Sequence, residues 1–277
     1  MMPRMRIFLL LTLAGLVVAG CGSDATKPAV STAPDLPPTD SWNIDFSAFD
    51  QAGAPALLET QGAMATTTRA NFLNAALRVA FVRTAAVIVL TPPSLAFTAA
   101  IHTQPTAAGD STWLWTYSWT DSTNQALAIH LTGRVHPDHV YWELRLTNPN
   151  ADPPLQGFLW YSGESSLLSF SGYWILNKNV GGEAVPVARI DWTRSAPGNR
   201  SLAFENLEEG SENAGDTMTY EVQTPSASLI YHDASSSVDS AIAWNFLTGA
   251  GSIQVPDYND GEPACWDAQR DDVACAP

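Results

Sequence analysis

The residue whose chemistry the sequence defines most closely is Cys21, a thiol at the end of an export signal. Arg4 and Arg6 form a positively charged start, and a mainly apolar stretch follows over residues 7–18. Two small residues then lead directly into Cys21. This layout is typical of a cleavable export signal. The apolar stretch is also shorter than the roughly 20 residues that a membrane-spanning helix needs.

The tetrapeptide Val18-Ala19-Gly20-Cys21 resembles the lipobox of bacterial lipoproteins. The resemblance implies cleavage after residues 1–20, a diacylglyceryl thioether on Cys21, and usually a third acyl chain such as palmitate on the new N-terminus. Two or three acyl chains anchor a protein to a membrane essentially permanently. Because Gly22 and not an aspartate follows, the resemblance favours the outer membrane in a bacterium that has one. The alternative is an ordinary signal peptide with an incidental cysteine.

Cys265 and Cys275 are the other two cysteines of the chain. If Cys21 carries lipid, they form an even pair in an oxidising compartment, and we expect a disulfide between them. Closing so short a ring stabilises a fold by roughly 2–3 kcal/mol. A redox-active C-x-x-C pair is disfavoured by the spacing, and no neighbouring histidine or cysteine completes a zinc site. We expect neither a metal site nor a cofactor.

The charge of the mature chain excludes one class of partner. The sequence has 13 Lys and Arg and 28 Asp and Glu, so cleavage that removes Arg4 and Arg6 leaves 11 cations and a net charge near −17. Such a surface repels phosphate backbones and anionic head groups. We therefore expect no nucleic-acid partner, and we expect contact with the membrane through the lipid anchor.

Three carboxylates in or beside tryptophan-rich segments are candidates for acid–base chemistry: Glu143, Glu164 and Asp191. Glycoside hydrolysis uses two carboxylates several ångströms apart, one of them in an apolar pocket. The sequence does not bring the three together, and Glu143 beside Arg145 fits an exposed ion pair. We assign no catalytic residue, and a carbohydrate-active hydrolase is the alternative.

Two acidic segments contain oxygen ligands of the kind that calcium prefers. They are residues 208–212 with Asp216, and residues 257–262 with Asp267. Neither segment has the ligand spacing of an EF-hand, so solvated acidic loops are the favoured interpretation.

Eight of the ten tryptophans lie between Trp113 and Trp244. The favoured interpretation is that they fill the layer between a sheet and a helix. The alternative is an open groove, in which Trp113, Trp115, Tyr117 and Trp119 share one face of a strand and bind a glycan or an acyl chain.

Residues 21–42 are rich in Pro, Thr, Ser and Asp and predict an extended linker, followed by a single domain over residues 43–277. Apolar residues recur at helical spacing over residues 69–90. Pro92-Pro93 predicts the end of that helix, with a second short helix reaching about His102. Beyond Asp110 the period changes to two.

Eleven strands are predicted, at residues 113–119, 126–135, 140–147, 157–162, 167–176, 187–194, 201–205, 217–223, 228–233, 241–248 and 252–255. Turn residues between them include Asn177-Lys178-Asn179 and Gly181-Gly182. The short connections predict an antiparallel meander. Because the helices precede the strands, the fold class is α+β: a large, mainly β, curled and partial-barrel-like sheet packed on one or two N-terminal helices.

This outline is similar to that of the periplasmic lipoprotein-carrier proteins, although no motif in the chain supports the similarity. The functional expectation is a lipid-anchored envelope protein with a binding or structural role. A glycan, a lipid or another envelope protein is the expected kind of partner, and a protein-interaction module is the second alternative.

Overall fold

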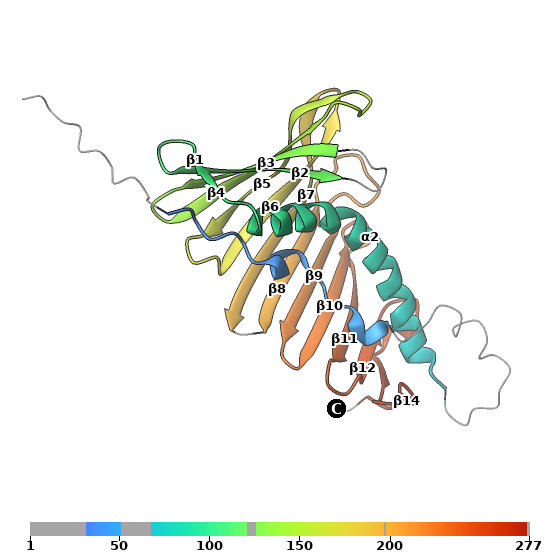
Figure 1. The fold of residues 1–277 in the computed structure, drawn as a ribbon. Helices are drawn as coiled ribbons and strands as arrows, with labels where there is room; N and C mark the ends of the chain where they lie inside the picture. The colour runs from blue at the N-terminus through green and yellow to red at the C-terminus, as the bar shows by residue number, and fades with distance from the viewer. Residues whose placement is uncertain (1–31, 51–67, 121–125, 197, 276–277) are drawn as a thin grey trace, which may run out of the picture.

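The computed structural model describes residues 32–50, 68–120, 126–196 and 198–275, which form one long helix lying across one large sheet (Figure 1). The sheet has 14 antiparallel strands that neighbour one another in the order of the sequence, and its first and last strands do not pair with each other. This confirms the α+β, mainly β, curled meander that the sequence predicts. Residues 1–20 and Cys21, the expected signal peptide and lipidation site, lie outside the described residues.

The helical elements are η1 (Thr39–Trp42), η2 (Ser47–Phe49), α2 (Ala70–Ile101) and η4 (Asn259–Gly261). The strands are β1 (Thr106–Ala107), β2 (Thr112–Thr120), β3 (Ala126–Val135), β4 (His139–Asn148), β5 (Leu155–Ser166), β6 (Ser171–Val180), β7 (Glu183–Ala196), β8 (Asn199–Asn206), β9 (Thr217–Gln223), β10 (Ser226–Asp233), β11 (Val238–Asn245), β12 (Gly251–Gln254), β13 (Ala264–Trp266) and β14 (Asp272–Val273). The eleven predicted strands correspond to β2 to β12. The three additional strands have only two or three residues each, too few for an alternating pattern.

Three predicted boundaries within the sheet are wrong. The predicted strand at residues 241–248 ends at Asn245, and residues 246–248 belong to the β11–β12 turn. The predicted strand at residues 167–176 begins only at Ser171, because residues 167–170 form the β5–β6 turn. The turn expected at Asn177-Lys178-Asn179 lies inside β6, where the Asn177 side chain donates a hydrogen bond to the Leu159 carbonyl 3.2 Å away. The chain turns instead at Gly181-Gly182, whose positive φ values of 63° and 99° suit glycine.

The predicted end of the helix at Pro92-Pro93 is also wrong, because α2 continues through both prolines as one helix of 32 residues. A proline inside a helix removes one hydrogen bond and usually costs ~3 kcal/mol or more. The turns that follow are held by the sheet: Ala96, Phe97 and Ala100 are buried against it. Tertiary packing therefore overrides the local preference.

The most regular feature of the sheet is a row in which tryptophans alternate with glycines across five strands. In register from β2 to β6, the row reads Trp113, Gly133, Trp142, Gly163 and Trp174. Trp142 covers Gly133 so closely that a Cβ there would lie 2.7 Å from its ring, and Trp174 covers Gly163 at 2.6 Å. Each large ring thus lies over a position without a side chain.

The same pairing recurs elsewhere in the sheet. Gly172 on β6 faces Trp192 on β7, and Gly251 on β12 lies between Trp244 on β11 and Trp266 on β13. A slip of one strand by two residues would place these rings against side chains. The pairs therefore fix the register as well as fill the core.

α2 lies across the concave face of the sheet and reaches both of its ends (Figure 1). Near its start, Phe72 packs edge-on against Trp266 of β13, with 5.8 Å between ring centroids. Near its end, Phe97 contacts Trp174 at 4.9 Å and Trp142 at 6.4 Å. Among the described residues, no helix is both long and apolar enough to cross a bilayer.

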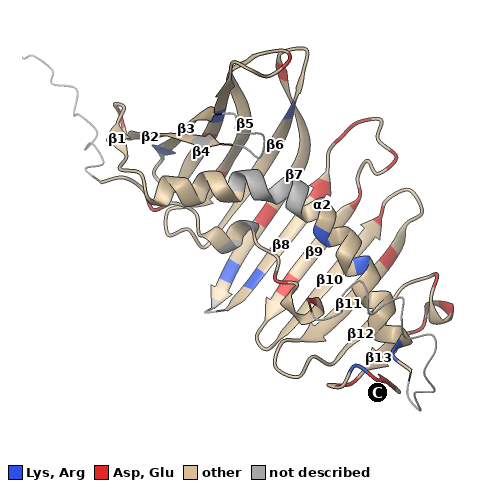
Figure 2. Ribbon diagram, turned by 45° about the vertical axis from the view of Figure 1, so that its right-hand side comes forward, with Lys and Arg blue, Asp and Glu red and all other residues tan. Residues whose placement is uncertain are grey.

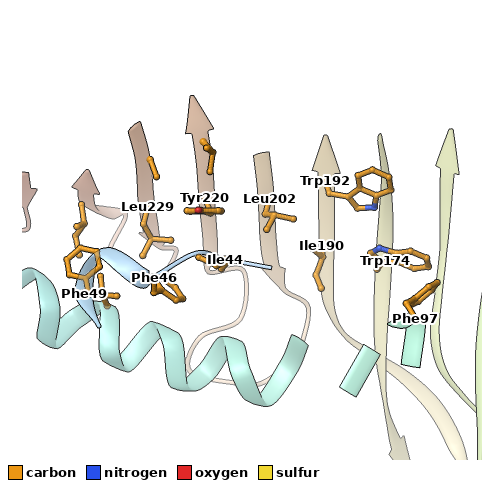
Figure 3. Close-up of a cluster of buried hydrophobic side chains, with 14 of the residues drawn as sticks. Ile44, Phe46, Phe49, Phe97, Trp174, Ile190, Trp192, Leu202, Tyr220 and Leu229 are labelled. Carbon is orange, nitrogen blue, oxygen red and sulfur yellow. The ribbon is translucent and has the colours of Figure 1, made fainter. Parts of the chain in front are cut away.

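A segment before the helix fills the space between α2 and the middle of the sheet. Ile44, Phe46 and Phe49 are buried there, beneath Leu202, Tyr220 and Leu229 (Figure 3). Phe49 packs on both sides, 5.2 Å from Trp244 and 5.8 Å from Phe72. The described part of the expected linker also packs, since Leu36 lies against the core and Ser41 is buried.

The start of α2 is capped by the far end of the chain. The first turn of the helix has no acidic residue of its own. Asp272 of β14 instead accepts hydrogen bonds from the backbone N–H of Ala70 and Asn71, at 3.1 and 2.9 Å, and from the Thr68 hydroxyl. A carboxylate at this place satisfies free N–H groups and suits the positive end of the helix dipole.

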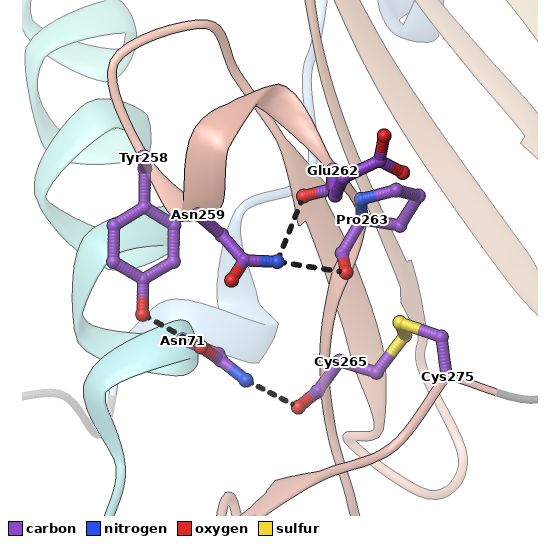
Figure 4. The surroundings of a disulfide bond; sticks show 7 residues. All are labelled: Asn71, Tyr258, Asn259, Glu262, Pro263, Cys265 and Cys275. Atoms are coloured by element: carbon purple, nitrogen blue, oxygen red, sulfur yellow. Dashed lines mark hydrogen bonds between the residues drawn. A yellow bond between two sulfur atoms is a disulfide. The ribbon is translucent and has the colours of Figure 1, made fainter.

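A disulfide holds the capping segment in place. Cys265 and Cys275 are bonded, as the sequence predicts, with their Cα atoms 5.2 Å apart. The Asn71 side chain donates to the Cys265 carbonyl at 2.7 Å and accepts from the Tyr258 hydroxyl at 2.6 Å (Figure 4). The two hydrogen bonds tie the start of α2 to β13 and to the connection before it, and the disulfide ties β13 to the chain just after β14.

Replacement of Gly133 by alanine tests the tryptophan–glycine pairing. The new methyl group would clash with the Trp142 ring, so we expect the free energy of unfolding, measured by chemical denaturation, to fall by about 1–3 kcal/mol. In a Trp142→Phe background the same change should cost less, because the smaller ring leaves room. An equal cost in both backgrounds would contradict the pairing.

Replacement of Asp272 by alanine tests the long-range cap. We expect a loss of about 1 kcal/mol in the free energy of unfolding, as for other helix caps. Asp271→Ala is the matched control, because it removes only the neighbouring ion pair to Arg69, whose side chain is 58% exposed. We expect Asp271→Ala to lower the free energy of unfolding by less than Asp272→Ala does, because exposed ion pairs contribute little to stability. A cost at Asp271 equal to that at Asp272 would contradict the capping role.

Candidate functional site

The tryptophan strand that the sequence singles out as a ligand face is β2. Trp115 is buried, Trp113 is partly buried and packs against the core, and the side chain of Trp119 lies outside the described residues. The Tyr117 hydroxyl donates a hydrogen bond to the Ala96 carbonyl of α2 at 2.7 Å. Burial raises the pKa of Tyr117 well above its ordinary value, so it remains a neutral donor.

The neighbouring aromatic side chains are covered in the same way. Trp142 and Trp174, like Trp115, are at most 2% exposed, and Phe97 of α2 lies against Trp142 and Trp174. A glycan or an acyl chain on this face would have to displace the end of the helix. The placement supports the interpretation in which the tryptophans form the layer between sheet and helix.

Polar atoms within this layer are of two kinds. The Trp142 indole N–H donates to the Ser165 hydroxyl at 2.9 Å, a buried bond between β4 and β5. The indole N–H groups of Trp192 and Trp244 are buried without a hydrogen-bond partner in the described structure. A buried donor without a hydrogen-bond partner costs about 1–3 kcal/mol.

The three candidate carboxylates lie on the opposite, convex face. Glu164 on β5 and Asp191 on β7 share a row with Tyr141 and Tyr173, which separates the two carboxylates by two strand spacings, about 10 Å. Glu143 is one row away, opposite Ser162. The sheet therefore brings the three onto one surface, which the sequence alone does not show.

Each of these carboxylates has a polar partner on this face. Arg189 binds Asp191 through two hydrogen bonds of 2.7 Å and stacks 4.3 Å over the Tyr173 ring. The pKa of Tyr173 is raised, first by burial and then by its hydrogen bond to Glu164. Glu143 accepts a bond from Arg145 at 3.3 Å, the ion pair that the sequence favours.

This arrangement differs from the pair of carboxylates that glycoside hydrolysis requires. An acid catalyst needs an apolar pocket that favours its protonated form, whereas Asp191 is half exposed and paired with a cation. The cluster of Tyr141, Glu164, Tyr173, Arg189 and Asp191 is a charged and aromatic surface, suited to binding more than to proton transfer.

In both acidic segments considered for calcium, some of the carboxylates make internal contacts. Asp257 pairs with Arg78 at 2.6 Å, which lowers the pKa of Asp257. Asp267 accepts from the backbone N–H of Gln269 and Asp271. Asp216 is buried and accepts from the Tyr231 hydroxyl. Within the described ranges no three His, Cys, Asp or Glu side chains gather as metal ligands would.

An open hollow of ≈ 490 Å³ lies elsewhere, between β11, β12 and the loop that follows. Its lining is Asp239, Ala241, Gln254, Val255, Pro256, Asp260 and Gly261. The sequence does not show it as a hollow, because its lining comes from segments that meet through the pairing of β11 with β12. Two of its lining residues are acidic, and one of them, Asp260, belongs to the segment 257–262 that the sequence offers for calcium.

Comparison of the chain with known protein families, with curated proteins and with solved structures finds no match. The assignment of a function therefore depends on the residues of this chain alone.

Replacement of Tyr117 by phenylalanine tests whether α2 is fixed over the tryptophan strand. We expect a loss of about 1 kcal/mol at neutral pH, because one hydrogen bond to the helix is removed. The raised pKa of Tyr117 gives the wild type a stability that is fully present below about pH 10, the ordinary tyrosine value, and is lost as the pH rises further. The difference between wild type and variant, measured by urea denaturation, should therefore shrink above about pH 10. A difference that does not change with pH would contradict burial of the hydroxyl.

Proposed function

We propose that this protein is a lipid-anchored protein of the bacterial cell envelope with a non-enzymatic binding or structural role. The observation that carries the proposal is the lipobox-like sequence Val18-Ala19-Gly20-Cys21 behind an export signal. Diacylglyceryl transfer to Cys21 would fix the mature N-terminus in a membrane, facing the periplasm or the exterior. Gly22 favours the outer membrane where the bacterium has one.

Two features of the folded part support this proposal. The Cys265–Cys275 disulfide suits an exported protein, because thiols stay reduced in the cytosol. The aromatic residues are used to pack the sheet on α2, and the strand carboxylates have polar or cationic partners, which favours a binding or structural role over catalysis. A glycan, a lipid or another envelope protein would then meet the outer surfaces of the sheet.

One observation favours a second candidate, a protein-interaction module. In the part of the chain that the structure describes, only Trp113 and Leu114 of the nine-residue strand β2 pair with β1 on the outer side of the sheet. The rest of this edge has the form that an added strand from a partner protein uses. Binding would then involve main-chain hydrogen bonds and no small molecule.

Mass spectrometry of the protein purified from membranes of an expressing diderm bacterium tests the anchor. We expect the first peptide to begin at Cys21 with a diacylglyceryl group and an N-terminal acyl chain. A bare thiol at Cys21, or retention of residues 1–20, would overturn the proposal. Cys21→Ser is the matched control, and it should abolish the lipid mass and release the protein from the membrane fraction.

A further inference from the structure

A meander places its turns alternately at two borders of the sheet, and the two borders of this sheet differ in chemistry. The turns β1–β2, β3–β4, β5–β6, β7–β8, β9–β10, β11–β12 and β13–β14 lie along one border, which we call the apolar border. The turns β4–β5, β6–β7, β8–β9, β10–β11 and β12–β13 lie along the other, the acidic border.

The β5–β6 turn is the most apolar point of the apolar border. Leu167, Leu168 and Phe170 are 42%, 73% and 57% exposed, three large hydrophobic side chains within four residues. Leu247, in the β11–β12 turn of the same border, is 82% exposed. Burying a Leu or Phe side chain is favourable by about 1.5–3 kcal/mol. A cluster of exposed apolar side chains in one turn is therefore typical of a site that binds an apolar partner.

The β5–β6 turn has a fixed shape that points these side chains outward. The Ser166 hydroxyl accepts hydrogen bonds from the backbone N–H of Phe170 and Ser171, at 3.0 and 3.3 Å. Ser169 takes a positive φ of 52° and is buried, so the residues beside it face away from the sheet. The Arg194 N–H donates to the Phe170 carbonyl at 2.7 Å and ties the turn to β7.

Charge separates the two borders. The five turns of the acidic border hold eight carboxylates, namely Asp152, Glu208, Glu209, Glu212, Asp216, Asp257, Asp260 and Glu262, many of them visible in red along one side of Figure 2. The seven turns of the apolar border hold four, namely Asp110, Asp138, Asp267 and Asp271, and the exposed Arg194 lies beside the β7–β8 turn. Cations beside exposed Leu and Phe are the composition of surfaces that lie on a membrane interface.

The start of the described chain lies on the same side. In Figures 1 and 2 the first described residues enter at the left-hand border, where the strands β1 to β4 begin or end. Thr32, the first described residue, lies eleven positions after Cys21. A chain of that length reaches at most about 40 Å, so an anchor at Cys21 keeps the start of the described chain, on this side of the sheet, within that distance of the bilayer.

We propose that the apolar border faces the membrane and that Leu167, Leu168 and Phe170 of the β5–β6 turn insert into its interfacial region, with the acidic border turned away. This proposal rests on the lipid anchor proposed above and adds an orientation to it. The occupant of the turn is the bilayer that holds the anchor, because the acidic border is repelled by anionic head groups more strongly than the apolar border, which has fewer carboxylates and the exposed Arg194.

Spin labels on the lipidated, full-length protein in native membranes test this orientation. With Cys21 lipidated and Cys265 bonded to Cys275, Leu168→Cys provides a single reactive thiol at the turn. Ser236→Cys, in the exposed β10–β11 turn, is the matched control on the acidic border. We expect the label at 168 to collide several-fold more often with oxygen, which dissolves in lipid, relative to a polar nickel complex, and the label at 236 to show the opposite preference.

The outcomes separate the two proposals. A label at 168 that is as open to the nickel complex as the label at 236, in protein that is lipidated and membrane-bound, would overturn the orientation and leave the anchor intact. A label at 168 that is immobile and shielded from both reagents would show that protein covers the turn, and it would also overturn the orientation. Absence of lipid on Cys21 would overturn the anchor itself.

Discussion

The structure depends on a steric constraint: a tryptophan ring on one strand needs a position without a side chain on the next. Trp142 over Gly133 and Trp174 over Gly163 meet this need within a single row of the sheet. Trp266 over Gly251 repeats it near the other end. Large rings lying over glycines let neighbouring strands stay close while the concave face remains fully packed. A sheet with this many strands must curl. The tryptophan–glycine pairs determine where the large side chains of its concave face lie.

α2 depends on that layer and also completes it. The helix has no acidic residue in its first turn and contains two prolines, yet it continues for 32 residues. Its two ends are held by contacts from distant parts of the chain, the Asp272 cap at the start and the packing of Phe97 on Trp142 and Trp174 near the end. The disulfide restrains the segment that carries the cap. Residues near the C-terminus therefore stabilise a helix that precedes the sheet in the sequence.

Periodicity was enough to predict the fold class, because the alternation in β2 and the helical spacing before Pro92 both reflect burial of one face. Where tertiary contacts oppose local preference, prediction failed. Pro92 and Pro93 lie inside α2 because the turns after them are buried on the sheet, and Asn177 lies inside β6 because a neighbouring strand satisfies its side chain. Leu167 and Leu168 looked like strand residues by hydrophobicity, whereas they form an exposed turn.

The candidate site, like the fold, was only partly predictable from the sequence. Sequence picked out Glu143, Glu164 and Asp191, and the strand register places them on one surface. The contact of Tyr173 with Glu164 could not be read without that register, whereas Arg189 lies only two residues from Asp191 on the same strand. The Trp192 and Trp244 indole groups, buried without partners, gave no signal in the sequence. Asp272 lies 201 residues from the N–H group of Asn71 that it caps, which is beyond any local pattern.

Hydrogen exchange followed by mass spectrometry tests most directly whether α2 and the tryptophan layer form one unit. If they do, amides of residues 72–79 and 96–101 will exchange as slowly as those of β4 to β6, since both can open only when the layer separates. Rapid exchange throughout α2 beside a protected sheet would contradict the account, because it would show that the tryptophan face is closed by something other than this helix.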